Sequence, residues 1–279
     1  MSNFEKELRV AQEAAREAGD IIKASYARLS DADVGEKAVN DMVTVVDIAS
    51  QESVVARIRS AFPDDFIVAE EELAPEVNEG RDPEGSRRWF IDPLDGTTNY
   101  IHAYPMFACS IALEVDRRLS VGVTYNPLLD EMFTAATGTG AFLNGNPIRV
   151  SSVSEKNRTL FGTGFPFKAR RYLDLYLESF KYFFNNSRGV RRAGSATLDF
   201  AHVAAGRLDA FWEMTLSPWD MAAGVVLIEE AGGRVTDFFG GNRFLEDGHI
   251  VAGNGRFHDW MLEELGKIFS RDTDYNLRD

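Results

Sequence analysis

Apolar side chains recur at helical spacing between residues 4 and 28 of the chain. They are three or four positions apart, at Leu8, Ala11, Ala15, Ala18, Ile22 and Tyr26. This spacing places them on one face of an amphipathic helix. The polar residues 31–40 that follow predict a loop.

Short apolar runs bounded by turn residues predict a series of strands in the first half of the chain. The runs cover residues 41–47, 66–69, 89–91, 106–116, 119–125 and 141–150. Asn144-Gly145 in the last run is typical of a two-residue β-hairpin turn. A helix is predicted over 48–62, and a loop rich in Glu, Pro and Gly over 73–88. These elements favour an antiparallel sheet with helices packed on it.

The pattern changes near residue 151, where strand-like and helical segments begin to alternate. The strand-like segments are 159–164, 208–214, 233–238 and 250–253, and the helical ones are 173–184, 196–205 and 221–231. Such alternation is typical of an α/β lobe. We therefore expect two lobes, residues 1–150 and 151–279, packed as one unit of the α/β (α+β) class with the functional site between them.

The composition indicates a soluble globular protein, since 44% of the residues are hydrophobic and 27% are charged. No apolar run approaches the roughly 18 residues that span a bilayer. The amino-terminal segment carries both signs of charge, unlike a signal peptide, so we expect a cytoplasmic protein. The single cysteine, Cys109, excludes an internal disulfide and lies in an apolar run, which favours a small core residue over a nucleophile.

The formal net charge of −14 makes nucleic acid an unlikely partner, because nucleic-acid-binding proteins normally show a basic footprint. An acidic protein can still bind a phosphate ester if metal ions invert the local sign of charge. The acidity therefore favours a metal-dependent site over an arginine-lined phosphate pocket, although solubility alone would also explain it.

The segment 89–105, WFIDPLDGTTNYIHAYP, carries the clearest chemical signal. Because Pro93 pushes the preceding residue out of the helical region, we expect a strand that ends in a tight turn, with Asp92 and Asp95 aimed to one side. Gly96 and Thr97 then offer backbone N–H groups suited to a phosphate. Carboxylates for a hard cation beside amides for an anion point to metal-assisted phosphate chemistry. The alternative is a pair of Asx turns.

Three further acidic residues stand at the ends of predicted elements, and each has a purely structural alternative. Asp47 occupies the place of a helix N-cap, and Asp220 precedes the helix predicted at 221–231. Glu70 belongs to an acidic triplet that would fit a solvated loop.

The order of these acidic residues and their neighbours resembles the inositol monophosphatase family. The signature segments are EE at 70–71, DPLDGTTN at 92–99, WDMAA at 219–223 and EAGG at 230–233. Further matching segments are DMVT at 41–44, YNP at 125–127, GAFLNG at 140–145, TGFP at 163–166, GSA at 194–196 and VAGN at 251–254. The resemblance extends from about residue 5 to residue 260, and both signature motifs are present.

The resemblance implies a five-layer α-β-α-β-α sandwich of the inositol monophosphatase and fructose-1,6-bisphosphatase type, a homodimer, dependence on two or three Mg²⁺ ions and inhibition by Li⁺. It assigns the first Mg²⁺ to Glu70, Asp92 and the Leu94 carbonyl. It assigns the second to Asp92, Asp95 and Asp220, and Glu70 would also contact a third ion. Oxygen ligands are those that Mg²⁺ prefers.

The mechanism implied is direct attack of a metal-activated water on the phosphorus, with Glu70, Thr97 and Asp47 as catalytic residues. Thr97 and Asp47 would orient the water and accept its proton, and the Gly96 and Thr97 amides would hold the phosphate. The implied contacts to the substrate hydroxyls are Asp95, Gly194, Ser195, Ala196, Glu213 and Asp220. For Glu213 the alternative is a strand-end carboxylate that faces water.

Several alternatives remain open. Enzymes of the same fold that cleave 3′-phosphoadenosine 5′-phosphate usually carry Lys-Glu where this chain has Thr98-Asn99, which disfavours a nucleotide substrate. Fructose 1,6-bisphosphate and histidinol phosphate remain possible substrates. Some bacterial members of the family also associate with the transcription machinery, so a protein-interaction role is an alternative of a different class. The basic segment 188–192, RGVRR, is the only cluster that would suit it, and it could equally lie at a dimer interface.

Overall fold

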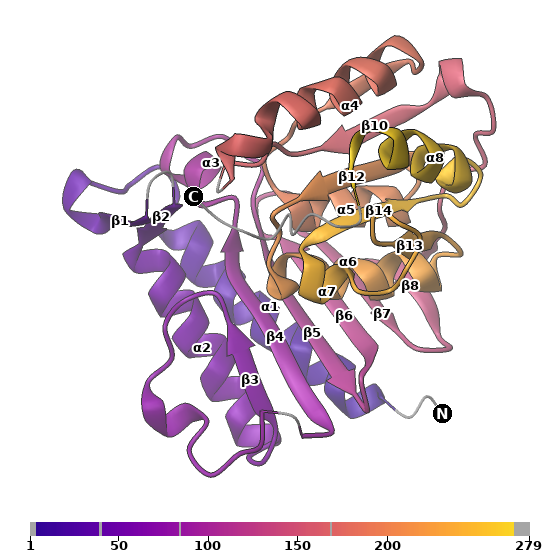
Figure 1. The fold of residues 1–279 in the computed structure, drawn as a ribbon. Helices are drawn as coiled ribbons and strands as arrows, with labels where there is room; N and C mark the ends of the chain where they lie inside the picture. The colour runs from indigo at the N-terminus through magenta and orange to yellow at the C-terminus, as the bar shows by residue number, and fades with distance from the viewer. Residues whose placement is uncertain (1–3, 39–40, 84, 168, 271–279) are drawn as a thin grey trace.

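The computed structural model describes residues 4–38, 41–83, 85–167 and 169–270, in which two β-sheets alternate with three layers of helices (Figure 1). The outer helices α1 (Glu5–Ser25) and α2 (Val45–Ala61) cover one face of the first sheet. Helices α5 (Ala196–Ala204) and α6 (Pro218–Glu230) lie between the two sheets. Helices α4 (Leu173–Asn185) and α8 (His258–Ile268) cover the far face of the second sheet. The predicted five-layer sandwich is confirmed.

The first sheet has seven strands in the order β3-β4-β5-β6-β7-β8-β9. Their bounds are β3 (Phe66–Ala69), β4 (Arg87–Asp95), β5 (Ala108–Val115), β6 (Arg118–Asn126), β7 (Glu131–Ala136), β8 (Gly140–Leu143) and β9 (Asn146–Ile148). The predicted antiparallel pairing is confirmed from β4 to β9, but β3 pairs parallel with β4. The hairpin turn is also confirmed, since Asn144 and Gly145 both have positive φ. Strand β7 was not predicted.

The second sheet has five strands in the order β11-β10-β12-β14-β13. Their bounds are β10 (Leu160–Thr163), β11 (Gly189–Arg191), β12 (Ala210–Met214), β13 (Arg234–Thr236) and β14 (His249–Gly253). Four of them were predicted. Strand β11 and helix α7 (Phe244–Asp247) were not, because they are short, and helix α8 was missed although its apolar residues recur at helical spacing.

The polar stretch 31–40 does not form the predicted loop in its described part. A 3₁₀ turn (Asp31–Asp33) leads into β1 (Val34–Ala38), which pairs antiparallel with β2 (Asp41–Thr44). Residues 39 and 40, and residue 84 of the predicted loop 73–88, lie outside the described residues. The β1–β2 hairpin has few apolar side chains, so the alternation that identifies a half-buried strand is missing.

Two helices begin three residues earlier than predicted, and for the same reason. At α2, Thr44 is the N-cap, and its backbone N–H donates to Asp47 Oδ2 at 2.9 Å. At α6, the Ser217 N–H donates to Asp220 Oδ2 at 2.7 Å. Both aspartates are therefore the third helical residue of a capping box, and neither is the N-cap itself. The interpretation of Asp47 and Asp220 as N-caps was wrong.

The core confirms the amphipathic pattern of α1, whose buried face includes Ala11, Ala15, Ala18 and Ile22. Cys109 on β5 is fully buried, and burial raises the pKa of its thiol to about 12, as expected for a core residue. Within the described part of the chain, every helix is too short or too polar to cross a membrane.

Candidate active site at the end of strand β4

A cavity of about 520 Å³ opens where β4 ends, beside the first turns of α3 (Thr97–Ile101), α5 and α6. The structure brings eleven of the twelve predicted site residues to its lining, and Asp47 is the one that does not line it. The lining includes Glu70, Asp92, Leu94, Asp95, Gly96, Thr97, Gly194, Ser195, Ala196, Glu213 and Asp220. Residues far apart in the sequence therefore share one hollow.

Strand β4 does not end after Ile91 as predicted but continues through Pro93 to Asp95. Asp92 pairs with Ser110 and Asp95 with Ala108, so one extra residue of β4 bulges out of the ladder. Proline lacks an N–H and is tolerated at such a bulge. The bulge, rather than a turn, directs this segment into the cavity, and the Leu94 N–H donates to Asp92 Oδ1 at 3.1 Å.

Asp92 is buried among other negative charges. Only 1% of its surface is exposed, and burial is the main cause that raises its pKa well above the ordinary value. The nearby carboxylates of Glu70, Asp95 and Asp220 raise it further. A buried carboxylate that lacks a compensating positive charge is unfavourable, so this position is suited to a cation.

Asp95 connects the end of β4 to the start of α5. Its Oδ2 atom accepts hydrogen bonds from the Ser195 hydroxyl at 2.5 Å and from the N–H and hydroxyl of Thr197 at 2.8 and 2.7 Å. Burial raises the pKa of Asp95, while these hydrogen bonds oppose the rise. Thr197 was not predicted as a site residue, because nothing in the sequence shows that α5 begins beside β4.

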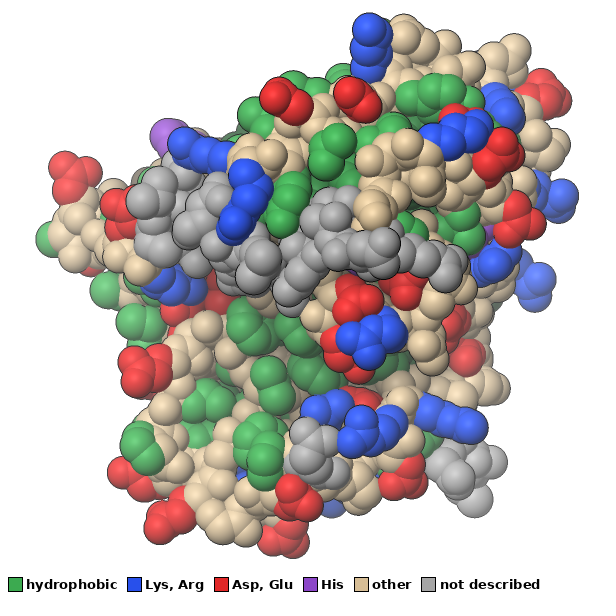
Figure 2. Space-filling view, viewed as in Figure 1, with side chains coloured by type: hydrophobic (Ala, Val, Ile, Leu, Met, Phe, Trp, Pro, Cys, Tyr) green, Lys and Arg blue, Asp and Glu red, His purple; other side chains and the backbone are tan. Residues whose placement is uncertain are grey.

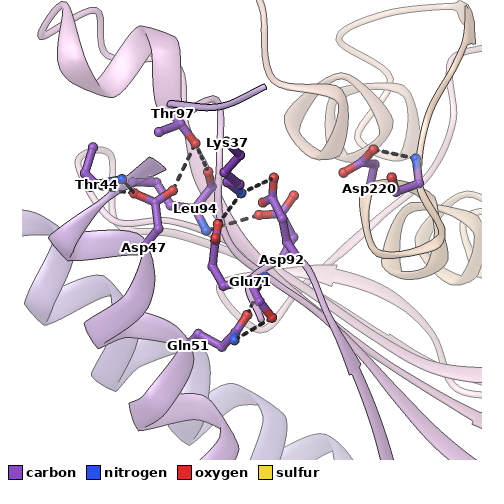
Figure 3. A network of polar contacts seen from close by, with 11 residues as sticks. Lys37, Thr44, Asp47, Gln51, Glu71, Asp92, Leu94, Thr97 and Asp220 are labelled. Atoms are coloured by element: carbon purple, nitrogen blue, oxygen red, sulfur yellow. Dashed lines mark hydrogen bonds and ion pairs between the residues drawn. The ribbon is translucent and has the colours of Figure 1, made fainter. Parts of the chain in front are cut away.

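Thr97 and Asp47 are hydrogen-bonded behind the cavity wall (Figure 3). The Thr97 hydroxyl lies 3.0 Å from Asp47 Oδ1 and 3.1 Å from the Leu94 carbonyl oxygen, so its one proton can go to either acceptor. The other Asp47 oxygen accepts from Thr44. Burial raises the pKa of Asp47 to about 6, even though these hydrogen bonds lower it.

Gly96 precedes α3 with a φ of 91°, which favours glycine. A Cβ atom there would lie 2.8 Å from the Met106 carbonyl oxygen and 3.2 Å from that of Gly194. Asn99 on α3 donates its side-chain N–H groups to the carbonyls of Met106 and Gly194 at 2.7 and 3.1 Å. Glycine and asparagine together hold the 194–196 segment against the end of β4.

Lys37 on β1 reaches the same acidic cluster (Figure 3). Its Nζ atom lies 2.5 Å from Glu71 Oε1 and 3.3 Å from Glu70 Oε1. Gln51 of α2 fixes the backbone of Glu71 by two hydrogen bonds, one to its carbonyl and one from its N–H. Lys37 and Glu71 were not among the predicted site residues.

The profile of the inositol monophosphatase family matches residues 3–269, almost the whole chain. The chain belongs to the inositol monophosphatase family. Among similar proteins of this kind, the "Nus factor SuhB" of Pseudomonas aeruginosa is 49% identical over 92% of this chain and 95% of its own length.

Two solved structures also match closely. The extragenic suppressor protein suhB from Bartonella henselae is 36% identical, covers 95% of this chain and 100% of its own, and superposes with a TM-score of 0.88. The inositol monophosphatase from Anabaena is 40% identical, covers 96% of this chain and 98% of its own, and has a TM-score of 0.82. The fold of this inositol monophosphatase family member therefore agrees with that of its relatives.

The donor set at the cavity fits the Mg²⁺ that the family generally uses. The predicted ligands, which are four of the carboxylates that line the cavity and the Leu94 carbonyl, offer only oxygen atoms, and Asp92 lacks a compensating charge. In the described residues, however, no three acidic, His or Cys side chains converge closely enough to hold an ion as they stand. Glu70 pairs with Lys37, and Asp220, which lies apart in Figure 3, accepts from Ser217.

Proposed function

We propose that the chain is a Mg²⁺-dependent, Li⁺-sensitive phosphatase that hydrolyses inositol 1-phosphate or a similar polyol phosphate monoester. The observation that carries the proposal is the buried Asp92 carboxylate, which lies among further acidic groups in a cavity also lined by Gly96 and Thr97. Membership of the family supports phosphatase chemistry. The alternative substrates are fructose 1,6-bisphosphate and histidinol phosphate, and a phosphatase for either would use the same kind of acidic centre.

Two or three Mg²⁺ ions are part of the proposal. Glu70, Asp92 and the Leu94 carbonyl would hold the first, Asp92, Asp95 and Asp220 would hold the second, and Glu70 would contact a third. Bound there, Mg²⁺ lowers the pKa of a coordinated water and offsets the charge on the leaving alkoxide.

The chain's own residues position the attacking water and accept its proton. Thr97 would orient the water through its hydroxyl oxygen and pass its own hydroxyl proton to Asp47 Oδ1, 3.0 Å away. A pKa of about 6 suits Asp47 to accept a proton near neutral pH, because a base works best when its pKa is close to the operating pH. The backbone N–H groups of Gly96 and Thr97 would hold the phosphate oxygens.

The alcohol would be bound by residues that line the same cavity. The proposed contacts to its hydroxyls are Asp95, Gly194, Ser195, Ala196, Glu213 and Asp220. Support comes from Glu213, which lies within β12 and lines the cavity, in contrast to the water-facing alternative.

The proposal is tested by phosphate release in Mg²⁺ from five esters, each with and without Li⁺. The esters are inositol 1-phosphate, glycerol 2-phosphate, fructose 1,6-bisphosphate, histidinol phosphate and 3′-phosphoadenosine 5′-phosphate. We expect Li⁺-sensitive turnover that is fastest on inositol 1-phosphate and lost in Asp95→Asn. If Mg²⁺ raises the melting temperature but no ester is cleaved, the enzymatic proposal fails.

A second candidate is an interaction with the transcription machinery in the cytoplasm, and the name "Nus factor SuhB" of the P. aeruginosa relative supports it. The acidic composition still disfavours nucleic acid as the direct partner. On the face in Figure 2, Lys and Arg side chains lie among Asp and Glu side chains. Pull-down of purified transcription proteins by the wild type and by Asp95→Asn would separate this role from catalysis, since binding should survive the substitution.

We also propose a homodimer formed through α4. Leu173, Leu177 and Phe184 of this helix are 38%, 42% and 56% exposed. Ring contacts connect Phe184 through Phe180 and Phe165 to Phe167, which is also exposed. Such an apolar strip on a helix favours burial against a second copy.

A further inference from the structure

Asp199 on α5 lines the cavity, although it was not among the residues predicted from the sequence. Only 2% of its surface is exposed. Its Oδ1 atom is buried without a hydrogen-bond partner among the described residues. Such an orphaned acceptor is rare in native proteins, because it loses its hydration without a replacement.

Two glycines leave the space in which Asp199 and its neighbour Glu213 lie. A Cβ atom on Gly162 would be 3.3 Å from Asp199 Cγ, and one on Gly164 would be 1.7 Å from Glu213 Oε1. Residues two apart on a strand face the same side. Gly162 in β10 and Gly164 directly after it therefore leave room for two carboxyl groups beside the cavity.

The charges around this wall are mainly negative. Burial raises the pKa of Asp199, with a further contribution from Asp95, and burial together with Asp199 raises that of Glu213. Arg192 opposes both shifts, and its guanidinium lies 4.6 Å from the centre of the Phe167 ring. Carboxyl groups accept hydrogen bonds from hydroxyls, whereas a second phosphate would bring like charge to this wall.

We infer that Asp199 is a specificity-determining residue that accepts a hydrogen bond from a hydroxyl of the leaving alcohol, beside Glu213, and selects polyol monophosphates over bisphosphates. This inference rests on the proposed phosphatase function and names the substrate class for it. The orphaned oxygen would obtain its partner only when the polyol is bound.

The test compares kcat/KM for inositol 1-phosphate with that for 4-nitrophenyl phosphate, an ester whose leaving group has no further hydroxyl. In Asp199→Ala the ratio of the two constants should fall about 10- to 100-fold, because the alcohol loses one buried hydrogen bond. Asp199→Asn keeps one acceptor oxygen and should lose less. The relative rate on fructose 1,6-bisphosphate should rise.

Thermal unfolding gives a second readout. Because Oδ1 of Asp199 is buried without a partner, Asp199→Asn should keep or raise the melting temperature. Asp209 is the matched control, since it is equally a buried aspartate but accepts from Ser151 and from the Leu160 N–H. Asp209→Asn should lower the melting temperature and leave the specificity ratio as it is.

The inference would be overturned if Asp199→Ala lowered kcat/KM equally for all esters, or left the ratio of the two kcat/KM values unchanged. In that case the activity of the wild type would still support the phosphatase proposal. A wild-type protein that cleaves none of the esters would overturn both.

Discussion

The hydroxyl of Thr97 lies 3.0 Å from Oδ1 of Asp47, a residue fifty positions earlier in the chain. The contact joins the first turn of α3 to the first turn of α2. It brings the hydroxyl of a residue that lines the cavity next to a buried carboxylate. This pair is the basis of the proposed proton transfer.

Replacing Thr97 by Ala should lower kcat about 10²- to 10⁴-fold, because the attacking water loses the group that orients it and relays its proton. Thr97→Ser keeps the hydroxyl and should retain most of the activity. Asp47→Ala together with Thr97→Ala should lose little more than either alone, since the two act as one unit. Steady-state phosphate release measures these values, and fully multiplicative losses would contradict the relay.

Replacing Asp92 by Asn should reduce activity by about three decades or more, because it removes the carboxylate common to both proposed Mg²⁺ sites. In EDTA the same substitution should raise the melting temperature, since it removes a buried charge from an acidic cluster. Calorimetry with and without Mg²⁺ measures both the stability and the loss of Mg²⁺ response. A lower melting temperature in EDTA would argue against charge repulsion at this site.

Lys37→Met should lower the melting temperature in EDTA and increase the rise that Mg²⁺ produces. Without the ammonium group, Glu70 and Glu71 lose their counter-charge and repel each other until a cation is bound. Lys267→Met is the control, because Lys267 pairs with Glu263 and Glu264 on α8, away from the cavity. Equal Mg²⁺ responses in the two variants would refute this role for Lys37.

Acid should destabilise the protein through His258, which is 2% exposed. Burial lowers its pKa from 6.5 to about 4, so the unfolded state binds more protons between these values. The free energy of unfolding that neutral His258 contributes above pH 6.5 is therefore lost as the pH falls towards 4. The loss is about 3 kcal/mol for a pKa shift of this size. Urea unfolding of the wild type and of His258→Gln at pH 7, 5.5 and 4 should show a flatter pH dependence in the variant. Parallel curves would exclude His258 as the cause.

Leu177→Glu and Phe184→Glu together should convert a dimer into a monomer by placing charges on the exposed strip of α4. Leu129→Glu is the matched control, because Leu129 is 57% exposed but lies between β6 and β7. Light scattering coupled to gel filtration reads the mass. A wild type that is monomeric at all concentrations would reject the proposed dimer.

The sequence identified most strands and helices of the two sheets, because their apolar residues recur with clear periods of two or near 3.6. It was less successful at element ends. The starts of α2 and α6 were placed three residues late, since an acidic residue at the third helical position has the same composition signal as one at the N-cap. The short polar strand β1 gave no periodic signal and was predicted as a loop.

The sequence by itself determined the kind of chemistry: five acidic residues with DPLDGTTN and WDMAA indicate the family and an oxygen-rich centre. Only the tertiary structure decided which other side chains join that centre. Lys37 of β1 pairs with Glu70 and Glu71. Thr197 of α5 donates to Asp95, and Asp199 of the same helix lines the cavity. Proximity across two packed sheets depends on how the layers stack, whereas local patterns report only on neighbours along the chain.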